Sequence, residues 1–175
     1  MSAENRTLVI KIGTSSLTEH DGSLSHTKVA QIVQQVCMLK DRGDSVVIVT
    51  SGSIAAGFRR LGHTQRPKAI AAKQAAAAVG QGLLMEEYTR GLLEGGYVGA
   101  QILLTRGDFT DKRRYDNVFN ALMELLKCGA VPDQGPTWPA NVRMTGYASI
   151  SVFAAACSLF NHTCGHGRVP TNMYD

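Results

Sequence analysis

The sequence predicts an α/β fold, a three-layer sandwich in which helices flank a mostly parallel central sheet, incomplete towards the C-terminus. Three observations predict it. Short apolar runs that are typical of buried strands alternate with longer segments whose apolar residues recur at helical spacing. Glycine, proline or serine punctuates the boundaries between these segments. The resulting order, β-α-β-α-α-β-α-β, favours helices packed on a parallel sheet.

The first elements are the clearest. Residues 6–12 have a strong apolar bias and predict a strand. A helix is expected over residues 26–42, because its apolar residues recur at helical spacing, Ser25 can cap its first turn and Gly43 can end it. Residues 45–50, SVVIVT, form a continuous apolar run, which is typical of a buried central strand in a parallel sheet.

The alanine-rich stretch 68–93 predicts a helix that is interrupted at residues 80–82, where two glycines flank a glutamine. Strand and helix patterns alternate both before and after this helix. The remaining expected elements are a helix over residues 54–60, a strand within 96–105, a helix over 111–127 and a strand that begins at 130–132.

The pattern changes after Pro132. Residues 133–140 contain two prolines and show no strand alternation. We therefore divide the chain into an N-terminal part, residues 1–132, and a divergent tail, residues 133–175, for which we expect partial disorder and one apolar helix over 150–160.

Composition excludes several classes of function. No stretch approaches the roughly 20 apolar residues of a membrane span, and the N-terminus has no secretory pattern, so we expect a cytoplasmic protein. The formal charge of +4 is mild, and the basic residues lack interleaved aromatics, which argues against a nucleic-acid partner. The four cysteines fit no zinc pattern. Cys37 and Cys128 are expected in the core, and His162, Cys164 and His166 lack an evident fourth metal ligand.

Lys11 lies within an apolar strand, just before Gly13. A lysine there is costly unless an anion meets it, so one interpretation is a phosphate contact, with Gly13 and the backbone amides of Thr14, Ser15 and Ser16 forming part of an anion cradle. The other interpretation is a solvated lysine on an edge strand. No Walker A loop occurs in the chain.

Ser51, Gly52 and Ser53 follow the second strand and open a helix. The first turn of a helix offers free backbone N–H groups and the positive end of the helix dipole, which suit a carboxylate or a phosphate. The alternative is an ordinary helix cap. After the third strand, Arg106 and Asp108 fit a strand-end ion pair, and the basic residues 112–114 fit a solvated patch.

Six stretches together resemble the glutamate 5-kinase branch of the amino-acid kinase family. The resemblance is ordered, nearly free of gaps and covers residues 6–132. The stretches are VIKIGTSSL at 9–17, IVTSGSIAAG at 48–57, KQAAAAVGQ at 73–81, QILLTRGD at 101–108, RYDN at 114–117 and LLKCGAVP at 125–132.

This resemblance implies ATP-dependent phosphorylation of the side-chain carboxylate of L-glutamate, the first step of proline biosynthesis, with Mg²⁺ bound to the nucleotide. It implies that Lys11 contacts the ATP phosphates and carries catalysis, beside Gly13, Thr14 and Ser15. It implies that Ser51, Gly52 and Ser53 bind glutamate. Such a transfer between two anions needs positioning and charge neutralisation rather than a protein nucleophile. The family is commonly oligomeric, so a homo-oligomer is expected.

The resemblance stops at Pro132, where the family pattern calls for a strand leading to Asn-Glu-Asn-Asp. The expectation is therefore a truncated or frame-disrupted member with weak kinase activity or none. Two other hypotheses remain open. One is a kinase for a different carboxylate or carbamate, and the other is a catalytically inactive remnant that acts as a binding or regulatory module.

Overall fold

The computed structural model describes residues 6–134. Its centre is a four-stranded sheet with the strand order β1-β2-β4-β3, in which all three strand pairs are parallel. The strands are β1 (Thr7–Ile12), β2 (Ser45–Thr50), β3 (Gly99–Ile102) and β4 (Val131–Gln134). Because all strands point the same way, their carboxyl ends lie at one edge of the sheet. The predicted parallel sheet is therefore confirmed.

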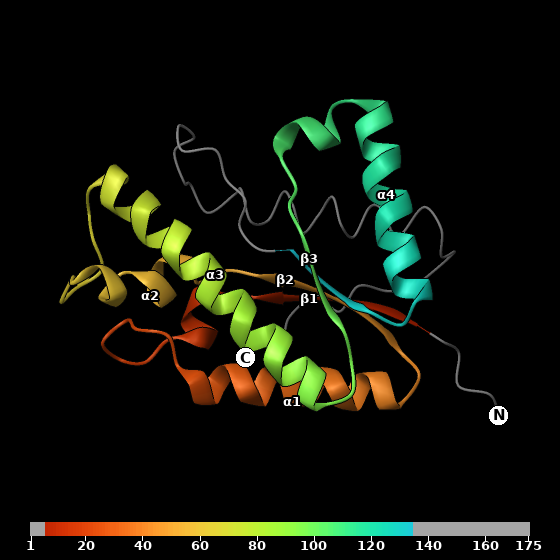
Figure 1. The fold of residues 1–175 in the computed structure, drawn as a ribbon, viewed down its shortest axis with the longest axis horizontal. Coiled ribbons are helices and arrows are strands. Elements are labelled where there is room, and N and C mark those ends of the chain that lie inside the picture. The colour runs from red at the N-terminus through yellow and green to blue at the C-terminus, as the bar shows by residue number, and fades with distance from the viewer. Residues whose placement is uncertain (1–5, 135–175) are drawn as a thin grey trace, which may run out of the picture.

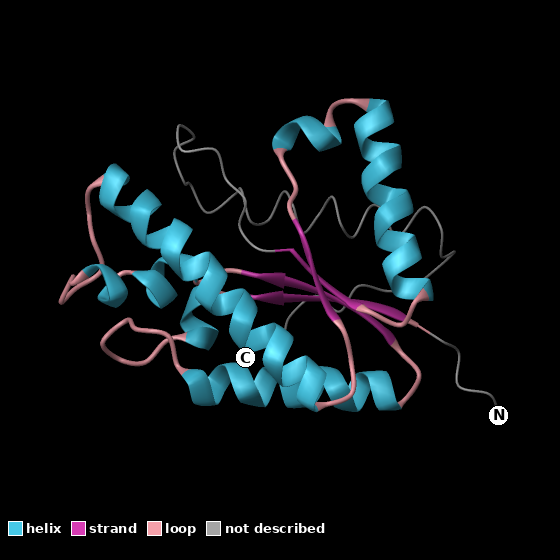
Figure 2. Cartoon of the chain, in the orientation of Figure 1, coloured by secondary structure: helices cyan, strands magenta, loops and turns pink. Residues whose placement is uncertain are grey.

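Helices cover both faces of this sheet, as Figures 1 and 2 show. α1 and α3 lie on one face and α4 lies on the other, which confirms the three-layer prediction. The α-helices are α1 (His26–Asp41), α2 (Ser53–Gly57), α3 (Ile70–Glu94) and α4 (Lys112–Lys127). The short 3₁₀ helices are η1 (Thr14–Leu17), η2 (Arg59–Leu61) and η3 (Arg106–Phe109).

Local side-chain chemistry explains where α1 and α4 begin. The Ser25 side chain accepts a hydrogen bond from the backbone N–H of Lys28 and caps α1, as predicted. Asp111 caps α4 in the same way through the N–H of Arg114. The predicted interruption of the alanine-rich helix is wrong, because α3 runs without a break from Ile70 to Glu94. Gly80 is explained by its close packing against the Ser53 carbonyl and not by a helix end, whereas an added Cβ at Gly82 meets no described residue within 4 Å.

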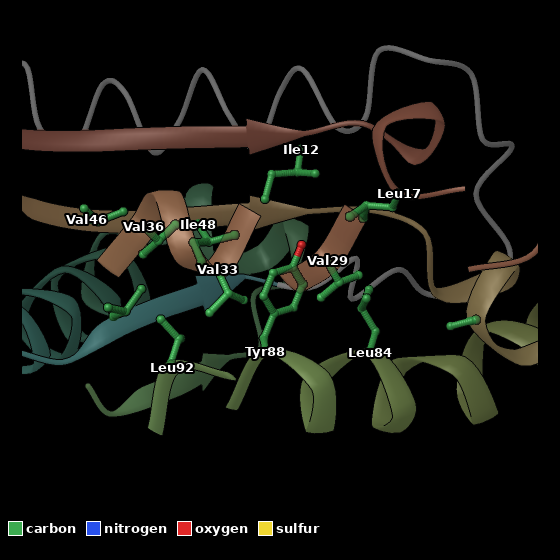
Figure 3. Close-up of a cluster of buried hydrophobic side chains, with 12 residues drawn as sticks. Ile12, Leu17, Val29, Val33, Val36, Val46, Ile48, Leu84, Tyr88 and Leu92 are labelled. Atoms are coloured by element: carbon green, nitrogen blue, oxygen red, sulfur yellow. The ribbon is translucent and has the colours of Figure 1, made fainter. Parts of the chain in front are cut away.

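The main core fills the space between the sheet and the α1–α3 layer. Figure 3 shows Tyr88 and Leu92 of α3 pointing towards Val33 of α1 and Ile48 of β2, all buried. A smaller cluster lies on the opposite face, where Leu122 and Leu126 of α4 pack on Val47 of β2. Consecutive residues of β2 thus serve alternate faces, which is why its sequence is apolar throughout.

The end of the described chain differs in part from expectation. β4 continues through Asp133 and Gln134, so the strand extends beyond Pro132. The expected tail, including the helix over residues 150–160, otherwise lies outside the described residues. Cys128 is exposed at the end of α4, so its predicted core position is wrong, whereas Cys37 packs against the main core. Within residues 6–134, no helix combines the length and the apolar character of a membrane span.

Candidate active site

The ends of β1 and β2 meet at the carboxyl edge of the sheet. Ile12 pairs with Thr50 in the parallel register, and the backbone N–H of Ser51 donates to the Ile12 carbonyl at 3.1 Å. The Ser51 hydroxyl donates to the same carbonyl at 3.0 Å, and its oxygen lies 3.2 Å from the hydroxyl oxygen of Thr14. The two predicted strand-end segments are therefore in direct contact.

The β1 end is open and cationic. Lys11 is exposed, and it forms no ion pair with another residue in the described range 6–134. By strand alternation it lies on the same face of the sheet as Val9, next to Val49. Among residues 6–134, a Cβ added at Gly13 would meet only the Ser15 hydroxyl, at 3.9 Å. This end therefore leaves room for a ligand that carries negative charge.

The β2 end is buried and tightly held. Gly52 has a φ of 110° and begins α2, and a Cβ there would lie 3.3 Å from Cδ1 of Leu17 in η1. Ser53 is only 4% exposed, so it can offer a ligand little beyond its backbone N–H. Ser51 remains half-buried. Of the three predicted glutamate contacts, only the Ser51 side chain lies near the surface.

Helix α3 braces the same turn from the other side. At Gly80 an added Cβ would come within 1.7 Å of the Ser53 carbonyl, and at Gly57 within 2.0 Å of the Ala76 carbonyl. The two helices therefore cross with their backbones nearly touching, which only glycine permits at these positions. Further along α3 from Gly80, the Tyr88 hydroxyl lies 3.2 Å from Oγ1 of Thr50.

Asp133 is a buried carboxyl that the sequence interpretation placed in the tail. It is 1% exposed, and neither of its carboxylate oxygens has a hydrogen-bond partner within residues 6–134. Its register neighbour Ile48 places it on the α3 side of the sheet, close enough to Tyr88 for an electrostatic interaction. Burial raises the pKa of Asp133 to about 7.

The other predicted polar groups have structural roles or fall outside the description. Asp108 accepts from the backbone N–H of Thr105 at 2.6 Å and from its hydroxyl at 2.7 Å, so it caps η3. These bonds hold the pKa of Asp108 below its usual range. Lys112 pairs with Asp116 on the exposed face of α4. His162, Cys164 and His166 lie outside the described residues. Within the described part, no group of three or more metal-ligating side chains occurs.

Three residues next to the site, Thr50, Tyr88 and Asp133, are absent from the site residues that the sequence predicted. Thr50 is the one polar side chain of β2 after its first residue, and it ends a strand whose other residues are apolar. That position was a usable indication. Tyr88 shares its helical spacing with the core residues Leu84 and Leu92, so the pattern indicates core packing and not a hydrogen bond.

Comparison with known proteins gives a consistent result. A family model described as the amino acid kinase family matches residues 6–134. A glutamate 5-kinase of Streptococcus suis (strain 05ZYH33) is 59% identical over 127 residues, which are 73% of this chain and 36% of that protein. A glutamate 5-kinase of Streptococcus pneumoniae (strain Hungary19A-6) is 59% identical over 125 residues, and one of Streptococcus sanguinis (strain SK36) is 56% identical over 125 residues. Each of these matches covers 71% of this chain and 34% of the relative.

The chain therefore spans about a third of the length of the curated relatives that it matches. The matched part contains both strand ends, the turn at Gly52 and the α2–α3 crossing.

Proposed function

Since the chain belongs to the amino acid kinase family, we propose that it acts in the ATP-dependent phosphorylation of the side-chain carboxylate of L-glutamate. The direct contact between the two strand ends, through Thr14 and Ser51, carries this proposal. Phosphoryl transfer requires a phosphate donor and an acceptor held within reach of each other. Two adjoining strand ends, one open and cationic and the other rich in hydroxyl and amide groups, meet that requirement. We take glutamate as the acceptor because the relatives are named glutamate 5-kinase.

In this proposal the β1 end is the nucleotide side. The exposed ammonium group of Lys11 would neutralise charge on the transferred phosphoryl group, and the open space at Gly13 would admit the phosphates close to the backbone at Thr14 and Ser15. ATP supplies the phosphoryl group. Mg²⁺ would bind mainly through the nucleotide oxygens.

The β2 end is the glutamate side. The acceptor is a carboxylate oxygen that attacks the terminal phosphorus while the bond to ADP breaks, giving glutamyl 5-phosphate and ADP. The backbone N–H groups of Gly52 and Ser53 are the donors for glutamate, and the Ser51 hydroxyl is the side chain within reach of it. The hydrogen bond from the Ser51 hydroxyl to the Ile12 carbonyl holds the Ser51 side chain at the junction of the two strands. We place this reaction in the cytoplasm, as the first step of proline biosynthesis.

We also propose that the protein self-associates, as its resemblance to a commonly oligomeric family implies. Sedimentation of the purified chain at several concentrations tests this, and a concentration-independent monomer would contradict it.

Glutamate-dependent release of ADP by the purified chain tests the proposed function. Turnover that requires glutamate and is lost in Lys11→Met supports it. Binding of glutamate and ATP without turnover would favour the alternative of an inactive binding module. If the chain binds neither ligand, both forms of the proposal fail.

A further inference from the structure

Helix α3 contacts the turn formed by residues 51–53 at two places, one just before the turn and one at its last residue. Before the turn, the Tyr88 hydroxyl meets Oγ1 of Thr50 at 3.2 Å. At the last residue of the turn, the backbone of Gly80 packs against the carbonyl of Ser53. A single rigid helix of 25 residues thus fixes both sides of the segment assigned to the glutamate side.

The hydrogen bonds at the first place form a short directed chain. Thr50 Oγ1 donates to the backbone carbonyl of Ser51 at 3.3 Å. A threonine hydroxyl has one proton to donate. The proton in the bond between Thr50 and Tyr88 therefore comes from Tyr88, and the order of donation runs from Tyr88 to Thr50 to the Ser51 carbonyl.

Because both hydroxyl groups are buried, water cannot easily replace these hydrogen bonds. Tyr88 is fully buried and Thr50 is 4% exposed, so neither hydroxyl has solvent as an alternative partner. Burial also raises the pKa of Tyr88 above its usual range, which keeps its donating proton in place. A buried hydroxyl that loses its partner is costly. The pair therefore constrains the Ser51 carbonyl in a way that a surface pair would not.

We propose that Tyr88 is a positioning residue for glutamate: its hydroxyl, acting through Thr50, fixes the orientation of the Ser51 peptide and so of the donor groups in the turn. The assignment of glutamate to this turn rests on the proposed function above. The positioning of the turn itself does not, because it follows from the hydrogen bonds of the unliganded chain. Tyr88 touches neither reacting group and acts only through the turn.

The test compares variants of the full chain that remove or keep a single hydroxyl. Tyr88→Phe keeps the ring in the core and removes only the hydroxyl. Thr50→Val removes the bond to Tyr88 from its other end and also removes the bond to the Ser51 carbonyl. Tyr97→Phe is the matched control, because Tyr97 also loses a hydroxyl bond, to Asp41 at 2.6 Å, but lies past the far end of α3. Two readouts are taken: hydrogen exchange at the amides of residues 51–53 without ligand, and the Kd values for glutamate and for ATP.

We expect Tyr88→Phe to weaken glutamate binding by about three- to tenfold and to speed exchange in the turn by a similar factor, with ATP binding changed less than about twofold. Thr50→Val, which also loses the bond to the Ser51 carbonyl, should weaken glutamate binding at least as much, and the double variant should be no worse than Thr50→Val alone. Thr50→Ser, which keeps the hydroxyl, should restore binding. The control should leave both readouts unchanged.

Exchange and glutamate binding that are the same in Tyr88→Phe as in the parent would overturn the proposal. An equal loss for glutamate and ATP would also overturn it, because that result indicates general loosening. If the parent chain binds no glutamate, the proposed function fails, and the exchange readout still decides whether Tyr88 positions the turn.

Discussion

The two strand ends of the candidate site differ in how the fold holds them. The β2 end is buried between η1 and α3, and its turn has a glycine at positive φ, backbone contacts on one side and a buried hydroxyl bond on the other. The β1 end carries an exposed lysine and has open space around Gly13. The comparison suggests a rigid side for a small acceptor and an open side for a larger, more mobile phosphate donor.

Gly80→Ala breaks the rigid side and has the largest expected effect. Its Cβ would lie 1.7 Å from the Ser53 carbonyl, which is backbone and cannot rotate away. We expect a loss of about 4 kcal/mol of unfolding free energy, or failure to fold. Chemical denaturation measures it. The matched control is Gly82→Ala on the same helix, where an added Cβ meets no atom of the described residues within 4 Å, so stability should rise by up to about 1 kcal/mol. Equal effects in both would contradict the close crossing.

Asp133→Val tests the effect of the one buried carboxyl of β4, which lies on the α3 side of the sheet. The folded chain holds a proton on Asp133 up to about pH 7, whereas the unfolded chain releases it near 3.8. The stability of the parent should therefore fall as pH rises from about 4 to about 7, by roughly 2–4 kcal/mol, and this component should be level above that. The variant should lose that slope and be the more stable form at pH 8. Denaturation at pH 5 and pH 8 measures both, and a parent that gains stability across this interval would contradict the account.

Gly52→Ala and Gly13→Ala compare the two ends directly. Gly52 has a φ of 110° and a close contact with Leu17, so alanine there should cost about 1–2 kcal/mol. Gly13 has a φ of −77° and open surroundings, so alanine there should change stability by less than about 0.5 kcal/mol. Thermal unfolding of both variants measures the difference. A larger loss at Gly13 would reverse the assignment of rigid and open sides.

Lys11→Met should have the smallest effect on stability, below about 0.5 kcal/mol, because the side chain is exposed. Its effect should appear in nucleotide affinity, with ATP binding weakened by about tenfold through loss of one charge contact. Titration calorimetry measures this. Lys127→Met is the control, since Lys127 is an exposed lysine at the end of α4, just before β4 starts, and therefore at the opposite edge of the sheet. Similar losses for both lysines would indicate a general charge effect.

Sequence patterns predicted the parts of this fold that depend on neighbouring residues. Local chemistry accounts for the helix cap at Ser25 and the strand at residues 45–50. The contact between the two strand ends follows from the parallel pairing of β1 and β2. The continuous α3 helix could not be predicted, because Gly80 is required by a contact with Ser53, 27 positions earlier in the chain. The Tyr88–Thr50 bond joins residues 38 positions apart. No pattern along the chain specifies such pairs.

The most direct test maps both ligands onto the backbone by NMR, using amide shifts of the full chain titrated with glutamate and, separately, with ATP and Mg²⁺. We predict that glutamate shifts the amide signals of residues 51–53, that ATP shifts those of residues 13–15, and that each ligand strengthens the other's effect where Thr14 meets Ser51. Shifts from the two ligands on opposite edges of the sheet, or none at either strand end, would contradict it.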